Sequence, residues 1–424
     1  MRQKRCPHRY SRPSVPPRSV PRHRRVQRRS GGLSLLIAAV AVTGSSCGLT
    51  GHSGTSPAPR VLGEPRGTPL TVGQPAPGGT GELSAVSCAN ARRCWAVGVA
   101  GPNPAPAAVG TTVIVATTNG GVSWRAQHVA GGSTPQLSGV SCPTVTRCMA
   151  VGSNGASLPG SGVVVTTTNA GSTWSPATSP TNALAVTSVA CTASSSCTAI
   201  VTDGTLTWSA HSDDFAQSWH QEGGLPSLFL PSNGLTCVGS GSCLVAGYIP
   251  TSTGHGEGAV ALSTDGGHTW ALASVPVGMG LMQSTACLSA LQCVVAGTTN
   301  TTVSDVVPAK GQLLRSADGG HSWQASALPV PVDDVFGVAC PTATQCAMVG
   351  TKWIGLPAVA TGAVAQSVNG GVTFRASTAA YTPISLTALS CPTSSNCVAV
   401  GGDTVARLTL LTPKRAPKES RPHG

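Results

Sequence analysis

Residues 316–323 read SADGGHSW, and five further stretches follow the same eight-residue pattern: TTNGGVSW (117–124), TTNAGSTW (167–174), SDDFAQSW (212–219), STDGGHTW (263–270) and SVNGGVTF (367–374). Each octet has Ser or Thr first, Asp or Asn third and an aromatic residue last, with glycine in the middle of most copies. Short carboxylate and amide side chains bond to nearby backbone amides, and glycine accepts a left-handed backbone, so the pattern predicts a tight turn. Six copies indicate a repeated structural unit.

The cysteine spacing gives the length of this unit. Of the 16 cysteines, 14 form pairs with five residues between the partners: Cys88/Cys94, Cys142/Cys148, Cys191/Cys197, Cys237/Cys243, Cys287/Cys293, Cys340/Cys346 and Cys391/Cys397. Successive pairs are 46 to 54 residues apart, a period typical of β-propellers and other repeat arrays. We predict seven disulfide bonds, each within one hairpin. A zinc site would require shorter gaps and histidines in register, so we assign no metal and no other cofactor.

The composition favours short strands over helices. The chain has 52 Gly and 33 Pro, only 9% of its residues are charged, and no long segment shows apolar residues at helical spacing. In the second repeat, β-like runs at 137–143, 147–152 and 162–168 are followed by the octet and by a fourth run that starts at 173–177. Four antiparallel strands in each repeat predict one propeller blade.

The octets resemble the Asp box of bacterial neuraminidase repeats, which occurs in sialidases and related propellers. Stretches such as CPTVTRCMAVG (142–152), followed by an octet, resemble the repeats of the photosystem II stability/assembly factor family. The resemblance covers residues 83–411 and implies a propeller in which the octet forms the turn between the third and fourth strands. It says little about activity, because such repeats occur in proteins of unrelated function.

The octets have a structural role in this interpretation. Asn replaces Asp in three of the six copies. A turn tolerates this change, whereas a catalytic acid does not. The aromatic residue is expected to pack between strands or blades, and His268 and His321, at variable octet positions, are expected to be solvated.

Six octets accompany seven cysteine pairs, which bears on how the ring closes. The last octet residue precedes the next cysteine pair by 17 or 18 residues, and counting back from Cys88 places an extra strand at 68–72. The seventh repeat has a third strand at 406–412 and then a polar tail. We predict an all-β, seven-bladed propeller of four-stranded blades, closed by an N-terminal strand that pairs into the last blade.

Length variation is confined to one interval of the repeat. The second cysteine precedes the octet by 15 to 23 residues, so the variable segment is the loop between the second and third strands. These loops share one face of a propeller with the connections between blades, and variable loops on a constant scaffold are typical of a working surface. We predict ligand or partner contacts from residues of this face: Tyr248, Glu257, Asp305, Asp333, Asp334, Lys352 and Trp353.

Two classes of function remain open. A sialidase-like enzyme needs clustered arginines, a tyrosine nucleophile and carboxylates, and paired-carboxylate hydrolysis would have to draw on Glu257, Asp305, Asp333 and Asp334. No catalytic residue can be named from this set. We favour a non-catalytic binding or assembly platform, and the alternative is a glycoside hydrolase acting on extracellular glycans.

The N-terminus indicates export. Residues 1–30 contain ten Arg, one Lys and no acidic residue, and they lead into LSLLIAAVAV (33–42), a pattern typical of a signal peptide and too short for a permanent membrane span. An oxidising compartment suits the predicted disulfides. Cys47, which precedes a polar linker, is a candidate for lipid attachment, and cleavage nearby with secretion is the alternative.

The predicted organisation is therefore a signal and targeting segment (1–47), a flexible linker (48–66), the propeller (67–412) and a polar tail (413–424). The expected partner is an extracellular protein or glycan, bound by a monomer at the cell envelope or after secretion. Nucleic acid is not expected as a partner, since residues 31–424 carry 15 basic and 14 acidic side chains (26 − 11 and 14 − 0). Membrane association is expected only through the lipid.

Overall fold

The computed structural model describes residues 71–72, 81–100, 111–132, 135–155, 161–239, 241–252, 256–299, 310–326, 332–354, 359–376, 382 and 384–412. The chain divides into two units, Met1–Leu62 and Gly63–Gly424, and every described residue belongs to the second. The predicted signal segment, linker and tail therefore lie outside the described residues, as do Cys47 and Asp305. No helix in the described part of the chain is long and apolar enough to cross a membrane.

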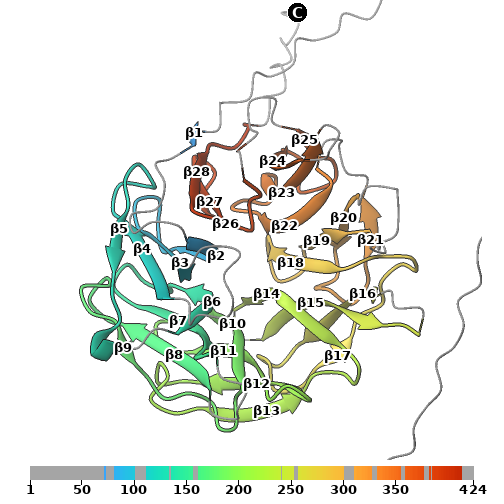
Figure 1. The fold of residues 1–424 in the computed structure, drawn as a ribbon. Helices are drawn as coiled ribbons and strands as arrows, with labels where there is room; N and C mark the ends of the chain where they lie inside the picture. The colour runs from blue at the N-terminus through green and yellow to red at the C-terminus, as the bar shows by residue number, and fades with distance from the viewer. Residues whose placement is uncertain are drawn as a thin grey trace, which may run out of the picture. The chain divides into compact units, whose positions relative to one another are not determined.

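The second unit is a seven-bladed β-propeller (Figure 1). Within the described residues, each blade is a four-stranded antiparallel sheet, and the first three blades follow the chain order from the innermost to the outermost strand. Blade 1 comprises β2 (Gly81–Cys88), β3 (Cys94–Ala100), β4 (Thr111–Thr117) and β5 (Arg125–Gln127), and a short 3-10 helix, η1 (Ala130–Gly132), follows it; blade 2 comprises β6 (Gln136–Ser141), β7 (Cys148–Ser153), β8 (Gly162–Thr167) and β9 (Ser175–Pro176); blade 3 comprises β10 (Ala185–Cys191), β11 (Cys197–Thr202), β12 (Thr207–Ser212) and β13 (His220–Gly224).

Blades 4 to 6 repeat this order, and blade 7 combines both ends of the propeller segment. Blade 4 comprises β14 (Leu230–Val238), β15 (Ser242–Pro250), β16 (Gly256–Ser263) and β17 (Ala271–Leu272); blade 5 comprises β18 (Met282–Cys287), β19 (Cys293–Thr298), β20 (Gly311–Ser316) and β21 (Gln324–Ser326); blade 6 comprises β22 (Asp334–Ala339), β23 (Cys346–Ile354), β24 (Val359–Ser367) and β25 (Arg375–Ala376). Blade 7 comprises β26 (Ala388–Thr393), β27 (Asn396–Gly401), β28 (Thr404–Leu408) and β1 (Thr71–Val72).

The blades are joined by apolar seams. The buried side chains form seven clusters, and each cluster combines residues of two neighbouring blades. One of them joins blade 1 to blade 7 through side chains such as Val86, Trp124 and Val400. Because β2 also contacts β26, the inner strands form a continuous ring. Strand β1 adds two residue pairs, Thr71 with Arg407 and Val72 with Ala406, and its predicted role in closing the ring stays a prediction.

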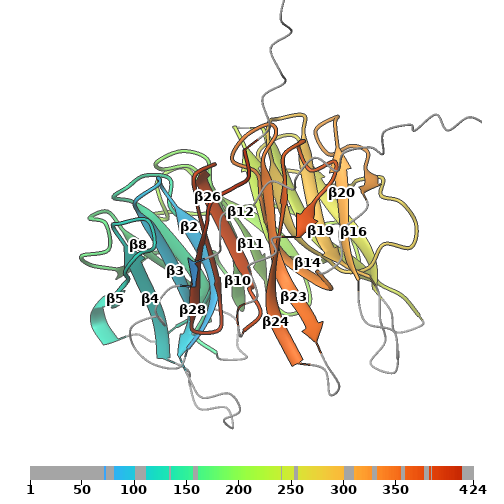
Figure 2. The same ribbon diagram turned by 90° about the horizontal axis from the view of Figure 1, so that it is seen from above.

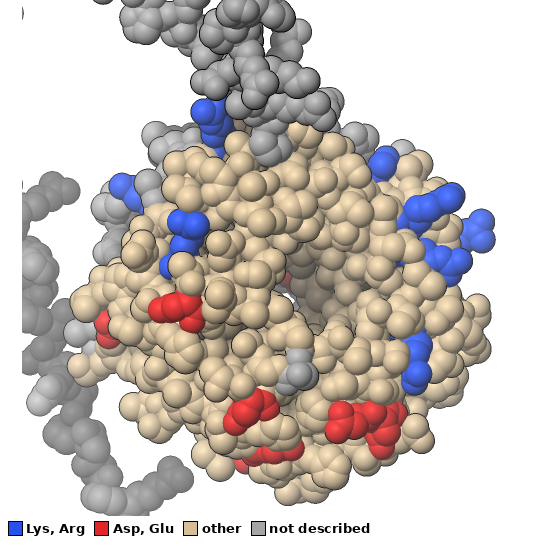
Figure 3. Space-filling view, turned by 180° about the vertical axis from the view of Figure 1, so that it is seen from behind, with Lys and Arg blue, Asp and Glu red and all other residues tan. Residues whose placement is uncertain are grey.

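Antiparallel pairing separates the connections into two faces, which lie at opposite ends of the strands (Figure 2). The hairpin face carries the turns between first and second strands, with their disulfides, and the octet turns between third and fourth strands. The loop face carries the connections between second and third strands and those from one blade to the next. Figure 3 views the hairpin face and shows that the molecule is hollowed at the centre of the ring.

Candidate functional site

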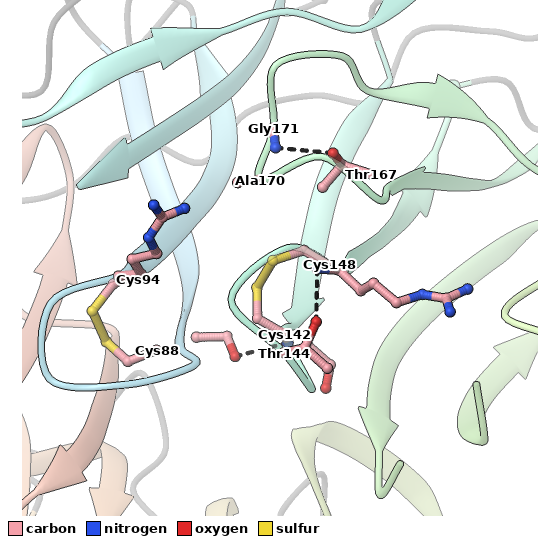
Figure 4. The surroundings of a disulfide bond; sticks show 12 residues. Cys88, Cys94, Cys142, Thr144, Cys148, Thr167, Ala170 and Gly171 are labelled. Carbon is pink, nitrogen blue, oxygen red and sulfur yellow. Dashed lines mark hydrogen bonds between the residues drawn. A yellow bond between two sulfur atoms is a disulfide. The ribbon is translucent and has the colours of Figure 1, made fainter. Parts of the chain in front are cut away.

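The hairpin face is built from one unit that recurs in blades 1 to 6. In each of these blades, the N–H of the fourth octet residue donates to the carbonyl two residues before the second cysteine, as Ala170 does to Thr146 at 2.9 Å. Figure 4 shows how the octet turn of blade 2, with Thr167 and Gly171, lies over its Cys142–Cys148 hairpin. The octet turn therefore hydrogen-bonds to the hairpin that the disulfide closes.

All seven predicted disulfides are present, each between cysteines six positions apart in the chain. They are Cys88–Cys94, Cys142–Cys148, Cys191–Cys197, Cys237–Cys243, Cys287–Cys293, Cys340–Cys346 and Cys391–Cys397. The predicted pairing is confirmed, and no bridge among the described residues joins two blades.

The bridged hairpins of blades 4 and 7 differ in one detail from the other five. In blades 1, 2, 3, 5 and 6 the second cysteine is the first residue of its strand. Cys243 and Cys397 are instead the second residues of β15 and β27, because the residues before them, Ser242 and Asn396, already pair with the preceding strand. Cys243 is 2% exposed and Cys397 is fully buried, so both side chains belong to the interior of the blade.

The octet side chains are occupied within their own turns. In blade 5 the Ser316 hydroxyl donates to Asp318 Oδ1 (2.7 Å) and accepts from Gly320 N–H (2.8 Å), while Ser322 N–H donates to Asp318 Oδ1 (3.0 Å). The Asn-containing octets keep this pattern, and Asn119 Nδ2 donates to Ser123 Oγ (2.9 Å), where the Asp-containing octets have a hydroxyl donating to the carboxylate. The structure thus confirms that Asn and Asp are interchangeable in the turn, because Oδ1 of either residue accepts the same two hydrogen bonds.

These hydrogen bonds acidify the octet carboxyls. Hydrogen bonds from the Ser218 hydroxyl and amide lower the pKa of Asp214 to about 2. Partial burial opposes the shift at Asp265, but the Thr269 hydroxyl and amide still lower its pKa to about 2. The Ser322 hydroxyl and amide hold the pKa of Asp318 even further below its usual range. A carboxyl held in its ionised form by bonds within its own turn is poorly suited to act as a general acid.

The octet of blade 3 departs from the others. Phe215 and Ala216 occupy the two central positions with φ of 61° and 65°, a left-handed backbone that disfavours side chains by roughly 1–2 kcal/mol per residue. The Phe215 ring is 5% exposed and lies 4.3 Å from the Arg147 guanidinium carbon of blade 2. Burial of an aromatic ring contributes roughly 1.5–3 kcal/mol, which offsets much of this strain.

The structure brings four of the predicted contact residues together at the loop-face end of blade 6. Lys352 Nζ lies 3.1 Å from Asp333 Oδ1, and Trp353 N–H donates to Asp333 Oδ2 at 2.9 Å. Trp353 Nε1–H donates to Asp334 Oδ2, also at 2.9 Å. These bonds fix the indole at the end of the β23–β24 hairpin, where 43% of Trp353 is exposed. The cluster presents a rigid, solvent-facing aromatic side chain.

Tyr248 and Glu257 lie apart from this cluster, in the β15–β16 hairpin of blade 4. Tyr248 pairs with Gly258, and its ring covers Gly256, where an added Cβ would lie 2.6 Å from Tyr248 Cδ2. Glu257 is exposed and alternates to the opposite side of the strand from its two glycine neighbours. The structure therefore does not join all the predicted contact residues into one site, and Asp305 lies outside the described residues.

Sequence reasoning missed the apolar character of the loop face. Seven of the twelve large hydrophobic side chains that are exposed in the described residues lie on this face: Leu206, Leu228, Leu230, Val277, Trp353, Ile354 and Val359. Leu228 is 74% exposed and has a left-handed φ of 66° in the turn that leads from blade 3 to blade 4. Backbone strain that holds an apolar side chain in solvent is found where surfaces make contacts. The sequence feature that could have predicted these exposed side chains is the presence of apolar residues within short connections between strands, such as Leu206, Leu228 and Val277.

Sequence reasoning also missed the serine hydroxyls that join neighbouring blades near the disulfide hairpins. Ser87 Oγ accepts from Cys142 N–H of the next blade at 3.0 Å, and Ser141 Oγ accepts from Cys191 N–H at the same distance. Ser390 Oγ repeats the bond across the ring closure, to Cys88 N–H at 3.1 Å. These hydroxyls stabilise the seams between blades. Among the described residues, no group of three or more His, Cys, Asp and Glu side chains is arranged to hold a metal ion.

The strand topology and the hydrogen-bonded octet turns define a seven-bladed β-propeller. Three similar solved structures are YCF48 bound to a D1 peptide (14% identity, TM-score 0.57, covering 81% of this chain and 98% of that one), YCF48 from Cyanidioschyzon merolae (12%, 0.53, 81% and 99%) and a GH74 xyloglucanase from Xanthomonas campestris (15%, 0.55, 82% and 55%). At these identities the similarity concerns the fold alone. No protein-family model and no curated protein matches the chain.

Proposed function

We propose that this chain is an exported cell-envelope propeller that acts as a non-catalytic binding or assembly platform through its loop face. The observation that carries the proposal is the concentration of exposed apolar side chains there, with Trp353 fixed by Asp333 and Asp334. Exposed apolar groups and aromatic anchors are enriched where proteins bind partners. The seven disulfides are compatible with export.

The structural neighbours include both kinds of protein, since the YCF48 structure contains a peptide and the GH74 structure is a xyloglucanase. What favours binding over hydrolysis is that three loop-face carboxylates, Asp203, Asp333 and Asp334, accept hydrogen bonds within the fold. Both oxygens of Asp333 accept hydrogen bonds from blade 6, and Asp334 accepts one from Trp353. Asp203 caps its own turn through the amides of Thr205 and Leu206. A hydrolase would need carboxylates that face substrate across a gap of roughly 5–10 Å.

A matched pair of exposed leucines tests the choice of face. Leu228 on the loop face and Leu291 on the hairpin face are 74% and 61% exposed, so each tolerates replacement by a photoreactive amino acid. Crosslinking on intact cells should join the position-228 variant to a discrete partner, and Trp353→Ala should reduce that product severalfold at an unchanged melting temperature. A product that forms at position 291 and not at position 228 would show that the hairpin face is the working surface and reject the proposal.

The same purified protein distinguishes the hydrolase alternative. We expect no release of reducing sugar from xyloglucan and no cleavage of an aryl sialoside. Turnover that disappears in an Asp334→Asn variant of unchanged stability would replace the binding proposal with glycoside hydrolysis.

A further inference from the structure

The seam between blades 3 and 4 has an unusually small apolar core. Its cluster contains five buried residues, Ile200, Phe229, Val245, Ala259 and Ala261, whereas the other six seams each contain nine to thirteen in the described residues. Apolar burial is the main attraction between packed blades. Four partly buried residues, Leu225, Leu235, Ile249 and Trp270, also pack against this core, and polar contacts add to the attraction across the seam.

Those polar contacts converge on the octet turn of blade 4. Thr198 Oγ donates to the Gly266 carbonyl at 3.0 Å, and Trp270 Nε1–H donates to Ser209 Oγ at 2.9 Å. Gly223 N–H donates to the His268 carbonyl at 2.9 Å. A Cβ at Gly223 would lie 2.5 Å from that carbonyl oxygen, so only glycine permits this approach of the two backbones.

An ion pair lies beside the backbone contact. His268 Nδ1 is 2.8 Å from Glu222 Oε2, and the Glu222 side chain is only 20% exposed. His268 was expected to be solvated, and its side chain is indeed 52% exposed, but it also bridges the two blades. The hydrogen bond that His268 donates to the Glu222 carboxylate, opposed by slight burial, raises the pKa of His268 above its ordinary value.

We propose that the seam between blades 3 and 4 is a pH-dependent latch, held closed when His268 is protonated and loosened when it is neutral. The proposal does not depend on the function proposed for the loop face. Because the folded protein binds this proton more tightly than the unfolded chain, the latch is at full strength below the unfolded value of about 6.5. Its contribution is lost as the pH rises through the higher folded value.

The charges around His268 favour its protonated form. Glu222 faces it from β13, Asp265 from its own turn and Asp213 from the octet of blade 3. The ring of His211 of β12 also lies beside His268, with its centroid 5.7 Å away. Its Nε2 lies 3.1 Å from Asp213 Oδ1, and its Nδ1 contacts Thr198 Oγ at 3.1 Å.

The protein contains its own control for this device. In the next seam, Ser274 N–H donates to the carbonyl of His321, which occupies the same octet position in blade 5 as His268 does in blade 4. Among the described residues, however, His321 has no ion pair with a carboxylate of the preceding blade. Gly223 and Ser274 thus report on equivalent backbone hydrogen bonds. The Glu222 carboxylate lies beside the first bond, and no such carboxylate lies beside the second in the described residues.

Hydrogen exchange at these two amides tests the latch. In the full-length protein, protection of the Gly223 amide, corrected for intrinsic exchange, should fall roughly two- to fivefold between pH 6 and pH 9, the range expected of a half-exposed ion pair. Protection of the Ser274 amide should not change. Glu222→Gln, which keeps the shape of the side chain, should abolish the pH dependence at Gly223, while His211→Gln should leave it in place.

Three outcomes would overturn the proposal. The wild-type Gly223 amide could show no pH dependence, Glu222→Gln could retain it, or the Ser274 amide could respond to the same extent. Loss of the dependence in His211→Gln alone would assign the titration to His211 and likewise reject the latch described here.

Discussion

Replacing Asp318 separates the two roles that an Asp box could have. We predict that Asp318→Ala destabilises the propeller and that Asp318→Asn is nearly neutral. The carboxylate accepts bonds from the Ser322 amide (3.0 Å), the Ser316 hydroxyl (2.7 Å) and the Ser322 hydroxyl (2.5 Å). An asparagine repeats all three contacts, as Asn119 does in blade 1 with Thr117 and Ser123.

The loss of unfolding free energy in Asp318→Ala depends on whether water can replace Asp318 for each of its hydrogen-bond donors. Asp318 and Ser322 are exposed, so water replaces the acceptor for both Ser322 donors in the alanine variant. Ser316 is only 5% exposed, and its hydroxyl would lose its acceptor while still accepting from Gly320 N–H. One buried unsatisfied donor costs about 1–3 kcal/mol, and losing an Asp cap costs about 0.5–2 kcal/mol, so we expect about 1–2 kcal/mol for Asp318→Ala. Asp318→Asn should cost less than about 0.5 kcal/mol.

Urea unfolding at pH 7, followed by tryptophan fluorescence, measures both variants against the wild type. The slope of the transition should not change, because neither substitution alters the buried surface appreciably. An asparagine variant as unstable as the alanine variant would refute the reasoning, since the charge of Asp318, and not its hydrogen bonding, would then be what the turn requires.

Three further predictions concern acid, the N-terminal strand and Cys47. The stability that Asp214 and Asp265 contribute should be fully present above an unfolded pKa of about 3.9 and be lost as the pH falls through their folded pKa of about 2, so the urea midpoint of Asp265→Asn should depend less on pH between 4 and 2 than that of the wild type. Deleting residues 67–74 should lower the melting temperature without unfolding the ring, because the cluster that includes Val86 and Val400 still joins blades 1 and 7; an unchanged melting temperature would deny β1 any part in blade 7. Cys47→Ala should release the protein from the membrane fraction, and a variant that stays there with unchanged mass would exclude lipid attachment at this residue.

The sequence was sufficient to predict the repeated elements. Strict spacing of the cysteine pairs and the octets specified seven blades, the disulfide pairs and the separation of two faces. These features depend on local chemistry, such as a cysteine six positions from its partner or a Ser hydroxyl two positions from an Asp. Local rules of this kind act within one turn, so a single sequence carries them completely. The early strand starts before Cys243 and Cys397 were not predicted, because they depend on how far backbone pairing extends past each bridge.

Contacts between blades were harder to predict from the sequence. Glu222 and His268 are 46 positions apart, and nothing in either segment alone indicates that they pair. The Trp353 cluster was predicted as a set of loop residues, but the bonds from Trp353 to Asp333 and Asp334 depend on how β22 and β23 pair. The exposed apolar residues of the loop face were missed for a related reason, because burial depends on which segments cover a side chain.

Blade 3 shows how the missed features relate to one another. Its octet has Phe215 and Ala216 where five other octets have mostly glycine, and the resulting strain is offset in large part by burial of the Phe215 ring against Arg147 on the blade 2 side. The opposite side of the same blade meets blade 4 through the smallest apolar seam, where the pair of Glu222 and His268 lies. Blade 3 is therefore held by aromatic packing on one side and by polar and ionic contacts on the other. Where a repeat departs from its pattern, a compensating contact or a function is expected, and the latch between blades 3 and 4 accounts for the departure on the polar side.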